Sequence, residues 1–249
     1  NFKPIVKSIE SLNVSRRIKE ISKKLSSYNI NFRDNFWSST IMRILYITEL
    51  GLDTFFHIEN DVMMYIPFND LDLEKERVSM VRDNPTRVIP SILYFPTRQS
   101  QKELVSHMYD TIMNSRIFQN DMKILGSFTN FAELNIFPSK YTVYDGAAIG
   151  QYLGGIDARN TSNSESFKDK IDCYLKTKGF INETCVFKCD KGYEFSRKCI
   201  TDGKAVRDIY VIIDKKDQKI VSVIANLHIH SKQLYMFSSV FSININNII

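Results

Sequence analysis

Apolar and polar positions alternate along the chain in patterns that predict both helices and strands. Apolar side chains recur at helical spacing in Val14–Ser27 and again in Asn35–Leu50. Asn13 or Ser15 can cap the first of these helices, and Gly51 ends the second. A run dominated by apolar residues from Arg87 to Phe95 instead predicts a strand, closed by Pro96.

The same patterns predict further elements along the chain. We expect a helix over 100–114, short helices over 69–77, 121–131 and 167–177, a short strand at 141–144, and a hairpin of 209–214 with 219–224. At 249 residues and 43% hydrophobic composition, the chain can bury one substantial α/β domain or two small ones.

One apolar run, Leu52–Val62, ends abruptly in acidic residues. It predicts a buried strand with Glu59 and Asp61 at its C-terminal end, where ligands bind in open α/β sheets. Residues i and i+2 of a strand share a face, so we expect these two carboxylates to act together. Paired oxygen ligands suit Mg²⁺ or Mn²⁺ held jointly with substrate phosphates. The alternative is that the acids are only a polar exit from the strand into a turn.

A second candidate segment lies near the end of the chain. His228 and His230 are two residues apart in a predicted strand and therefore share a face. Neutral imidazole binds Mn²⁺ and related metals, and Lys232 is placed to meet a phosphate. Arg43, in the second predicted helix, needs a carboxylate or phosphate partner if it is buried. The alternatives are ordinary strand histidines and a surface arginine.

Small residues are concentrated in one segment of the chain. Four of the nine glycines fall within Gly146–Gly155, directly after Asp145. Small side chains allow a ligand or a packed element to approach the backbone closely. The spacing is not G-x-G-x-x-G, so no dinucleotide fingerprint is present. A tightly packed helix is the alternative.

Composition and charge limit the partners. The net charge of +5 fits an anionic ligand such as a nucleotide, and no basic stripe with interleaved aromatic residues favours nucleic acid. No apolar run reaches 18 residues and no signal peptide is visible, which predicts a cytoplasmic protein without a membrane span. The chain begins with Asn1 rather than Met, which indicates a fragment or a processed product.

All four cysteines fall in one region of the chain, at Cys173, Cys185, Cys189 and Cys199. Only the spacing of Cys185 and Cys189 is that of a zinc-ligand pair. A zinc site and a disulfide remain alternatives, and we expect reduced thiols in an intracellular protein.

Taken together, the motifs resemble those of a GT-A type glycosyltransferase, of the kind found in bacteria and large viruses. The resemblance covers roughly residues 35–239 and rests on the order of four motifs: Phe36-Trp37-x-x-Thr40-x-x-Arg43, Phe56-His57-Ile58-Glu59-Asn60-Asp61, the segment Tyr144–Gly155 and the segment Asn226–Lys232. It implies a Rossmann-like α/β fold, a central mixed and mostly parallel sheet flanked by helices. Residues 1–240 would form this single domain and 241–249 a C-terminal tail, in a cytoplasmic or virus-associated enzyme.

The resemblance also implies roles for individual residues. Glu59 and Asp61 would stand for the family's D-x-D motif and hold Mn²⁺ or Mg²⁺ on a nucleotide-diphosphate sugar, with His228 or His230 completing the metal site. Arg43 would brace the acidic motif, and Lys232 would neutralise the departing diphosphate. The segment of Asp145, Gly146 and Gln151 would line the cleft for the donor sugar and for a glycan or protein acceptor. Asp145 and Glu183 are the candidates for a catalytic base, which an inverting enzyme needs and a retaining enzyme does not.

One departure from the family matters. Such folds usually open with a strand–helix–strand unit that grips the nucleotide base, but only 58 residues precede Glu59 and no convincing pair of strands is found among them. That unit is either missing or rebuilt. The departure motivates a second hypothesis, a non-catalytic domain that binds nucleotide sugars or glycans. A third hypothesis, a metal-dependent phosphoesterase, needs more carboxylate ligands than the sequence offers.

Overall fold

The computed structural model describes residues 8–28, 35–84, 86–134, 139–143, 193–201 and 206–228. The chain divides into two compact units. The first unit comprises Asn1–His57, Glu74–Met80 and Pro85–Ala132, and the second comprises Ile58–Leu73, Val81–Asn84 and Glu133–Ile249. Among the described residues, no helix has both the length and the apolar character needed to span a membrane.

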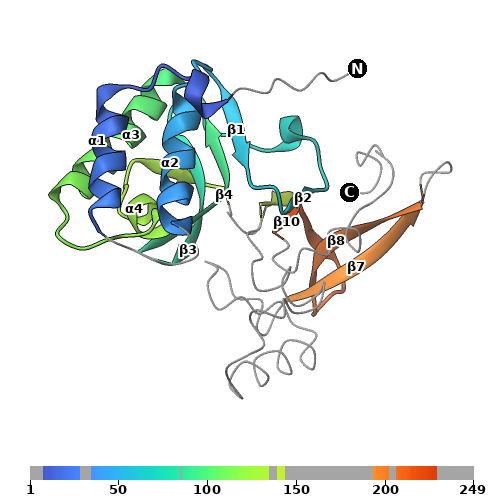
Figure 1. The fold of residues 1–249 in the computed structure, drawn as a ribbon. Coiled ribbons are helices and arrows are strands. Elements are labelled where there is room, and N and C mark those ends of the chain that lie inside the picture. The colour runs from blue at the N-terminus through green and yellow to red at the C-terminus, as the bar shows by residue number, and fades with distance from the viewer. Residues whose placement is uncertain are drawn as a thin grey trace. The chain divides into compact units, whose positions relative to one another are not determined.

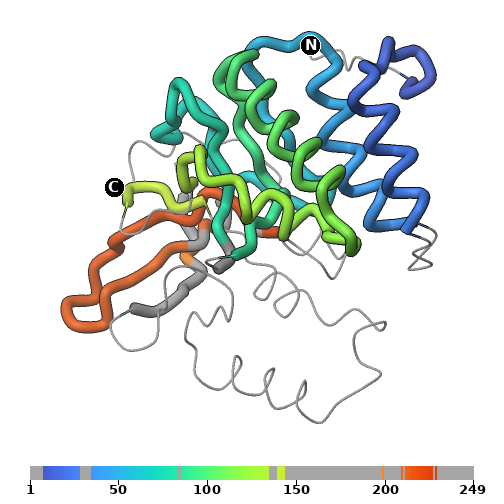
Figure 2. Tube along the Cα trace, turned by 90° about the vertical axis from the view of Figure 1, so that its left-hand side faces the viewer, coloured from blue at the N-terminus to red at the C-terminus, as the bar shows by residue number. Residues whose placement is uncertain are grey.

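The first unit combines four α-helices with most of a sheet (Figure 1). Its helical elements are η1 (Ile9–Ser11), α1 (Arg16–Ser26), α2 (Phe36–Thr48), α3 (Arg98–Asn114) and α4 (Asp121–Gly126). The strands β1 (Phe55–Ile58), β3 (Val78–Asn84), β4 (Arg87–Phe95) and β5 (Phe131–Glu133) form a sheet in the order β1-β4-β3-β5. Helices α1, α2 and α3 lie side by side, as Figures 1 and 2 both show.

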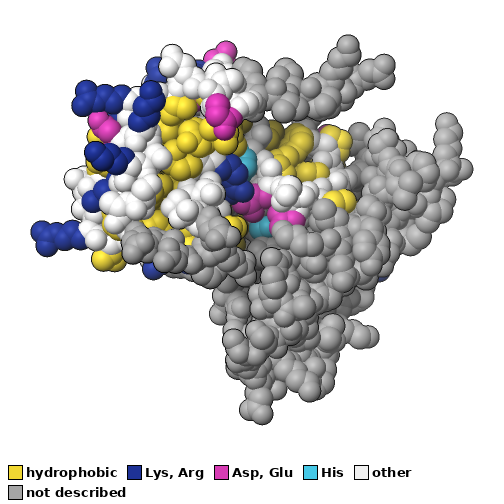
Figure 3. All heavy atoms as spheres, viewed as in Figure 1, with side chains coloured by type: hydrophobic (Ala, Val, Ile, Leu, Met, Phe, Trp, Pro, Cys, Tyr) yellow, Lys and Arg dark blue, Asp and Glu magenta, His cyan; other side chains and the backbone are white. Residues whose placement is uncertain are grey.

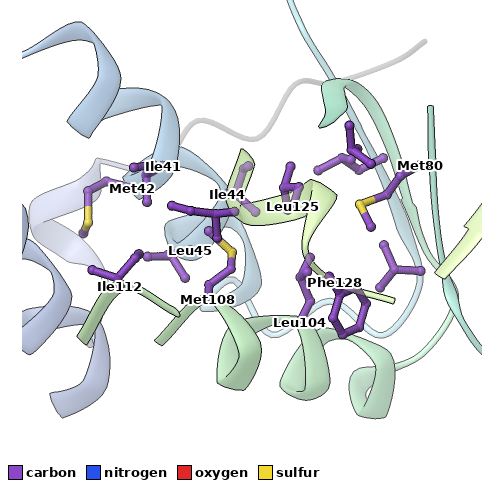
Figure 4. Close-up of a cluster of buried hydrophobic side chains, with 14 of the residues drawn as sticks. Ile41, Met42, Ile44, Leu45, Met80, Leu104, Met108, Ile112, Leu125 and Phe128 are labelled. Carbon is purple, nitrogen blue, oxygen red and sulfur yellow. The ribbon is translucent and has the colours of Figure 1, made fainter. Parts of the chain in front are cut away.

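Burial of apolar side chains explains this arrangement. Helix α1 buries Ile18, Ile21 and Leu25 on one face, and its Lys and Arg residues are largely on the solvated side of the helix (Figure 3). Helices α2, α3 and α4 and strands β3, β4 and β5 contribute apolar residues to the same core (Figure 4). Its members include Ile41, Ile44, Leu45, Met80, Leu104, Met108, Ile112 and Leu125. The side chain of Thr97 accepts a hydrogen bond from the backbone N–H of Ser100 and so caps α3.

The structure confirms the predicted helices over 14–27, 35–50 and 100–114 and the strand over 87–95. The helix predicted over 69–77 is wrong, because only the 3₁₀ turn η2 (Phe68–Asp70) forms there. The carboxylate of Glu74 accepts hydrogen bonds from the backbone N–H groups of Lys75 and Glu76, and such local bonds compete with helix formation. The helix predicted over 121–131 ends early, at Gly126.

A buried histidine makes the stability of the first unit depend on pH. His57, on β1, is 7% exposed, and its Nε2 has no hydrogen-bond partner among the described residues. Burial, and secondarily the positive charge of Arg43, lower the pKa of His57 from 6.5 to about 4. The unfolded chain therefore binds a proton at higher pH than the folded protein does. His57 therefore leaves the free energy of unfolding at its full value above pH 6.5. That free energy decreases as the pH falls from 6.5 toward 4, because protonation then favours the unfolded chain.

We expect the free energy of unfolding to fall by about 2 kcal/mol between pH 7 and pH 5 through this residue alone. Urea unfolding followed by the fluorescence of Trp37 reports on the first unit, since this is the single tryptophan of the chain and lies on α2. The variant His57→Gln should lose most of this pH dependence. An equal dependence in the variant and the wild type would contradict the assignment.

The second unit is built from short strands. Strands β2 (Val62–Met64) and β10 (Asn226–His228) form an antiparallel pair. A second sheet has the order β6-β9-β8-β7, with β6 (Tyr141–Thr142), β7 (Tyr193–Thr201), β8 (Val206–Asp214) and β9 (Ile220–Ile224). Strands β8 and β9 confirm the predicted hairpin, whose loop is closed by a 2.8 Å hydrogen bond from the Asp214 N–H to the Lys219 carbonyl oxygen.

The described residues form a mixed α/β protein, but not around one mostly parallel sheet. Three separate sheets are present among them, and in the two sheets formed by β2, β10 and β6 to β9 only the pair of β6 and β9 is parallel. Consecutive strands joined by short connections must pair antiparallel, which is why β7, β8 and β9 do so. No strand precedes β1 in the described residues 8–28 and 35–54.

Candidate metal centre

The two acidic residues of the motif lie in a turn between strands. Strand β1 ends at Ile58, and β2 begins at Val62. The N–H of Val62 donates to the carbonyl oxygen of Glu59 at 3.2 Å, which closes a four-residue turn with Asn60 and Asp61 at its centre. The prediction that Glu59 and Asp61 share a strand face is therefore wrong. Asparagine and aspartate favour turns because their side chains tolerate the backbone conformations that turns require.

Strand pairing brings a histidine from a distant part of the sequence to this turn. In the antiparallel pair, His228 on β10 lies opposite Val62, the first residue after the turn. The pairing is extended by a 2.8 Å hydrogen bond from the Tyr65 N–H to the Ala225 carbonyl oxygen. The N–H of Ala225 in turn donates to the Thr142 carbonyl oxygen at 2.8 Å, which ties this segment to β6.

The three side chains converge within the second unit. The Nε2 of His228 lies 3.3 Å from Oε2 of Glu59 and 3.3 Å from Oδ1 of Asp61. The exposed fractions are 4% for the side chain of His228, 10% for Asp61 and 17% for Glu59. The cluster is thus largely shielded from solvent, with Glu59 as its most accessible member.

The donor set fits a divalent cation. One ligand atom from each of the three side chains can be chosen so that all lie within 4.8 Å of one another. Two carboxylate oxygens and one imidazole nitrogen suit Mn²⁺ and related metals, whereas Ca²⁺ prefers sites made of oxygen ligands alone. Buried carboxylates in close proximity repel each other, so a cation between them would lower the free energy of the folded state.

Of the other predicted site residues, the structure describes Arg43. Arg43 is half-buried on α2, belongs to the first unit, and lines an apolar cavity of about 440 Å³ there. The remaining predictions lie outside the described residues, namely Asp145, Gly146, Gln151, Glu183, His230, Lys232, Cys173, Cys185 and Cys189. Cys199 lies on β7.

One buried polar residue next to the cluster was not singled out from the sequence. Asn226 is fully buried on β10, two residues before His228 and therefore on the same face of the strand. Asparagine is depleted in strands, so its presence within the apolar run Ile224–Leu227 was the available signal.

Comparison of the chain with known protein families, with curated proteins and with solved structures finds no match.

Proposed function

We propose that the chain is a metal-dependent glycosyltransferase, which moves a sugar from a nucleotide-diphosphate donor to an acceptor hydroxyl on a glycan or protein. The observation that supports this proposal best is the convergence of Glu59, Asp61 and His228 from two distant parts of the chain. The resemblance to GT-A enzymes implied a metal site of Glu59 and Asp61 with either His228 or His230, and the pairing of β2 with β10 supports the choice of His228. The finer assignment, a Rossmann-like GT-A domain, is part of the proposal.

The three side chains of the cluster would act as metal ligands. Asp61 and Glu59 would hold Mn²⁺ or Mg²⁺, and His228 would hold it from the opposite strand. A bound cation stabilises the negative charge that develops on the diphosphate leaving group. Burial of the cluster lowers the local dielectric and strengthens each of these charge interactions.

Residues outside the cluster complete the proposed mechanism. Lys232 would neutralise the released diphosphate, and Asp145 or Glu183 would accept the proton of the acceptor hydroxyl in an inverting reaction. Gly146 and Gln151 would line the donor cleft, and Arg43 would contribute a positive charge to donor binding.

A panel of nucleotide sugars tests the proposal. Each donor is added to the full chain with and without Mn²⁺, and the melting temperature and donor hydrolysis are measured. We expect one donor to raise the melting temperature only with the metal present, because a ligand that binds only the folded state stabilises it according to its occupancy. Slow metal-dependent hydrolysis of the same donor should accompany this shift.

The other outcomes separate the competing hypotheses. Metal-dependent binding without transfer or hydrolysis would indicate a binding domain. Release of phosphate from generic phosphate esters would indicate a phosphoesterase. If no donor shifts the melting temperature in the presence of Mn²⁺, the glycosyltransferase proposal fails for this chain.

A further inference from the structure

Three basic side chains surround a small cavity in the first unit. Arg17 on α1 and Arg98 and Lys102 on α3 line this cavity of about 230 Å³, together with Glu49 at the C-terminal end of α2. Three positive charges thus face a single negative charge. Charges of one sign in a concave surface raise the local concentration of counter-ions.

Arg98 is held in place without being neutralised. Its Nη1 donates to the Thr48 carbonyl oxygen and to Oε1 of Gln101, both at 2.9 Å. Gln101 is itself 2% exposed and anchored, since its Nε2 donates to the carbonyl oxygens of Leu52 and Asp53 at 2.8 and 3.0 Å. All of these acceptors are neutral. The Nε and Nη2 donors of Arg98 make no hydrogen bond to the described residues and remain for a ligand.

The other two cations also have no carboxylate within ion-pair distance among the described residues. The guanidinium of Arg17 lies over the ring of Tyr109, with its Cζ 5.5 Å from the ring centroid. Lys102 is exposed and forms no ion pair within 4.0 Å among the described residues, and neither does Glu49. The cavity therefore combines one fixed guanidinium with two adjustable cations.

We infer that this cavity is a metal-independent site for a phosphate-bearing anion no larger than a diphosphate. The planar fork of an arginine matches two phosphate oxygens at once, and a flexible lysine adds a point charge. The volume is below the range typical of pockets for larger organic ligands. The site belongs to the first unit, whereas Glu59, Asp61 and His228 belong to the second, so it goes beyond the proposed function.

The test is a titration of the full chain with pyrophosphate in EDTA at low ionic strength, followed by ¹H–¹⁵N NMR. We expect saturable shifts of the amide signals of residues 98–102, with inorganic phosphate binding more weakly than pyrophosphate. Lys102→Ala should raise the Kd about threefold, and Glu49→Gln should lower it by a similar factor, as the removal of one solvent-accessible charge predicts. Lys123→Ala, which removes an exposed lysine on α4 outside the cavity, is the matched control and should leave the Kd unchanged.

Three results would overturn the inference: no saturable shift, a Kd that neither Lys102→Ala nor Glu49→Gln changes relative to the control, or loss of binding in Asp61→Asn alone. The last result would place pyrophosphate at the candidate metal centre. Because metal is absent and no turnover is measured, a negative result in this titration leaves the glycosyltransferase proposal standing. Equally, a negative result with the nucleotide sugars leaves the inferred phosphate site standing.

Discussion

If the proposed function holds, replacing Asp61 by asparagine should abolish the stabilisation of the protein by Mn²⁺ and the metal-dependent hydrolysis of the nucleotide-sugar donor. The substitution keeps the shape of the side chain but removes one of two carboxylates that lie 3.3 Å from Nε2 of His228. Loss of a residue that merely supports a ligand costs 10- to 100-fold in metal affinity, so loss of the ligand itself should cost about 100-fold or more. A metal at 100 times its Kd stabilises the wild type by about 2.7 kcal/mol, and this difference should disappear.

The matched control is Asp70→Asn, which removes the same charge from an exposed position of the same unit. Calorimetric titration with Mn²⁺ and melting curves with and without Mn²⁺ compare the two variants. His228→Gln should behave like Asp61→Asn. Equal Mn²⁺ responses in Asp61→Asn and Asp70→Asn would show that the cluster is not a metal site but a histidine bonded to two carboxylates.

Replacing Gly126 by alanine should destabilise the first unit by about 3 kcal/mol or more. A Cβ at Gly126 would lie within 3.0 Å of the backbone of Thr86 and Arg87, including 2.7 Å from the Cα of Arg87. Alanine favours a helix over glycine by about 1 kcal/mol, but a clash with backbone atoms cannot be relieved by a side-chain rotation. Overpacking of this kind costs about 1–3 kcal/mol even where side chains can adjust, so the clash outweighs the helix propensity.

Gly51→Ala provides the comparison for this prediction. Gly51 has a φ of 76°, but nothing lies within 4 Å of a Cβ added there. Only backbone strain opposes the substitution, at about 1 kcal/mol. Urea unfolding followed by Trp37 fluorescence measures both variants in the first unit. A loss in Gly126→Ala no larger than in Gly51→Ala would show that α4 and the β3–β4 turn can move apart at little cost.

The helices of the first unit were predictable because their apolar periodicity is strong. Strands β3 and β7 were not, and their residues show why. In β3 the buried Ser79 and the charged Arg82 interrupt the apolar pattern. In β7 the basic pair Arg197 and Lys198 falls in mid-strand, and the element forms by pairing with β8 along its full length. Pairing with a neighbour outweighs local propensity in such strands.

Three side chains that converge in the candidate site, those of Glu59, Asp61 and His228, were named from the sequence, but their geometry was not predicted. The acids were recognised because they end an apolar run, and the histidines because they alternate along a strand. Which histidine meets the acids was left open, and the structure places His228 beside them. That contact depends on a ladder of three residues on each strand, which is too short to leave a periodic signal in the sequence.

The short ladder between β2 and β10 also determines which kinds of genetic change the site can tolerate. Val62 faces His228 across the pair, and the side chains of a strand alternate between its two faces. Exchanging one apolar residue for another in β2 leaves this register intact. A single-codon insertion or deletion in either strand shifts it by one residue and turns the paired side chains to the opposite face. During divergence, this part of the chain should therefore accept substitutions while keeping its length fixed.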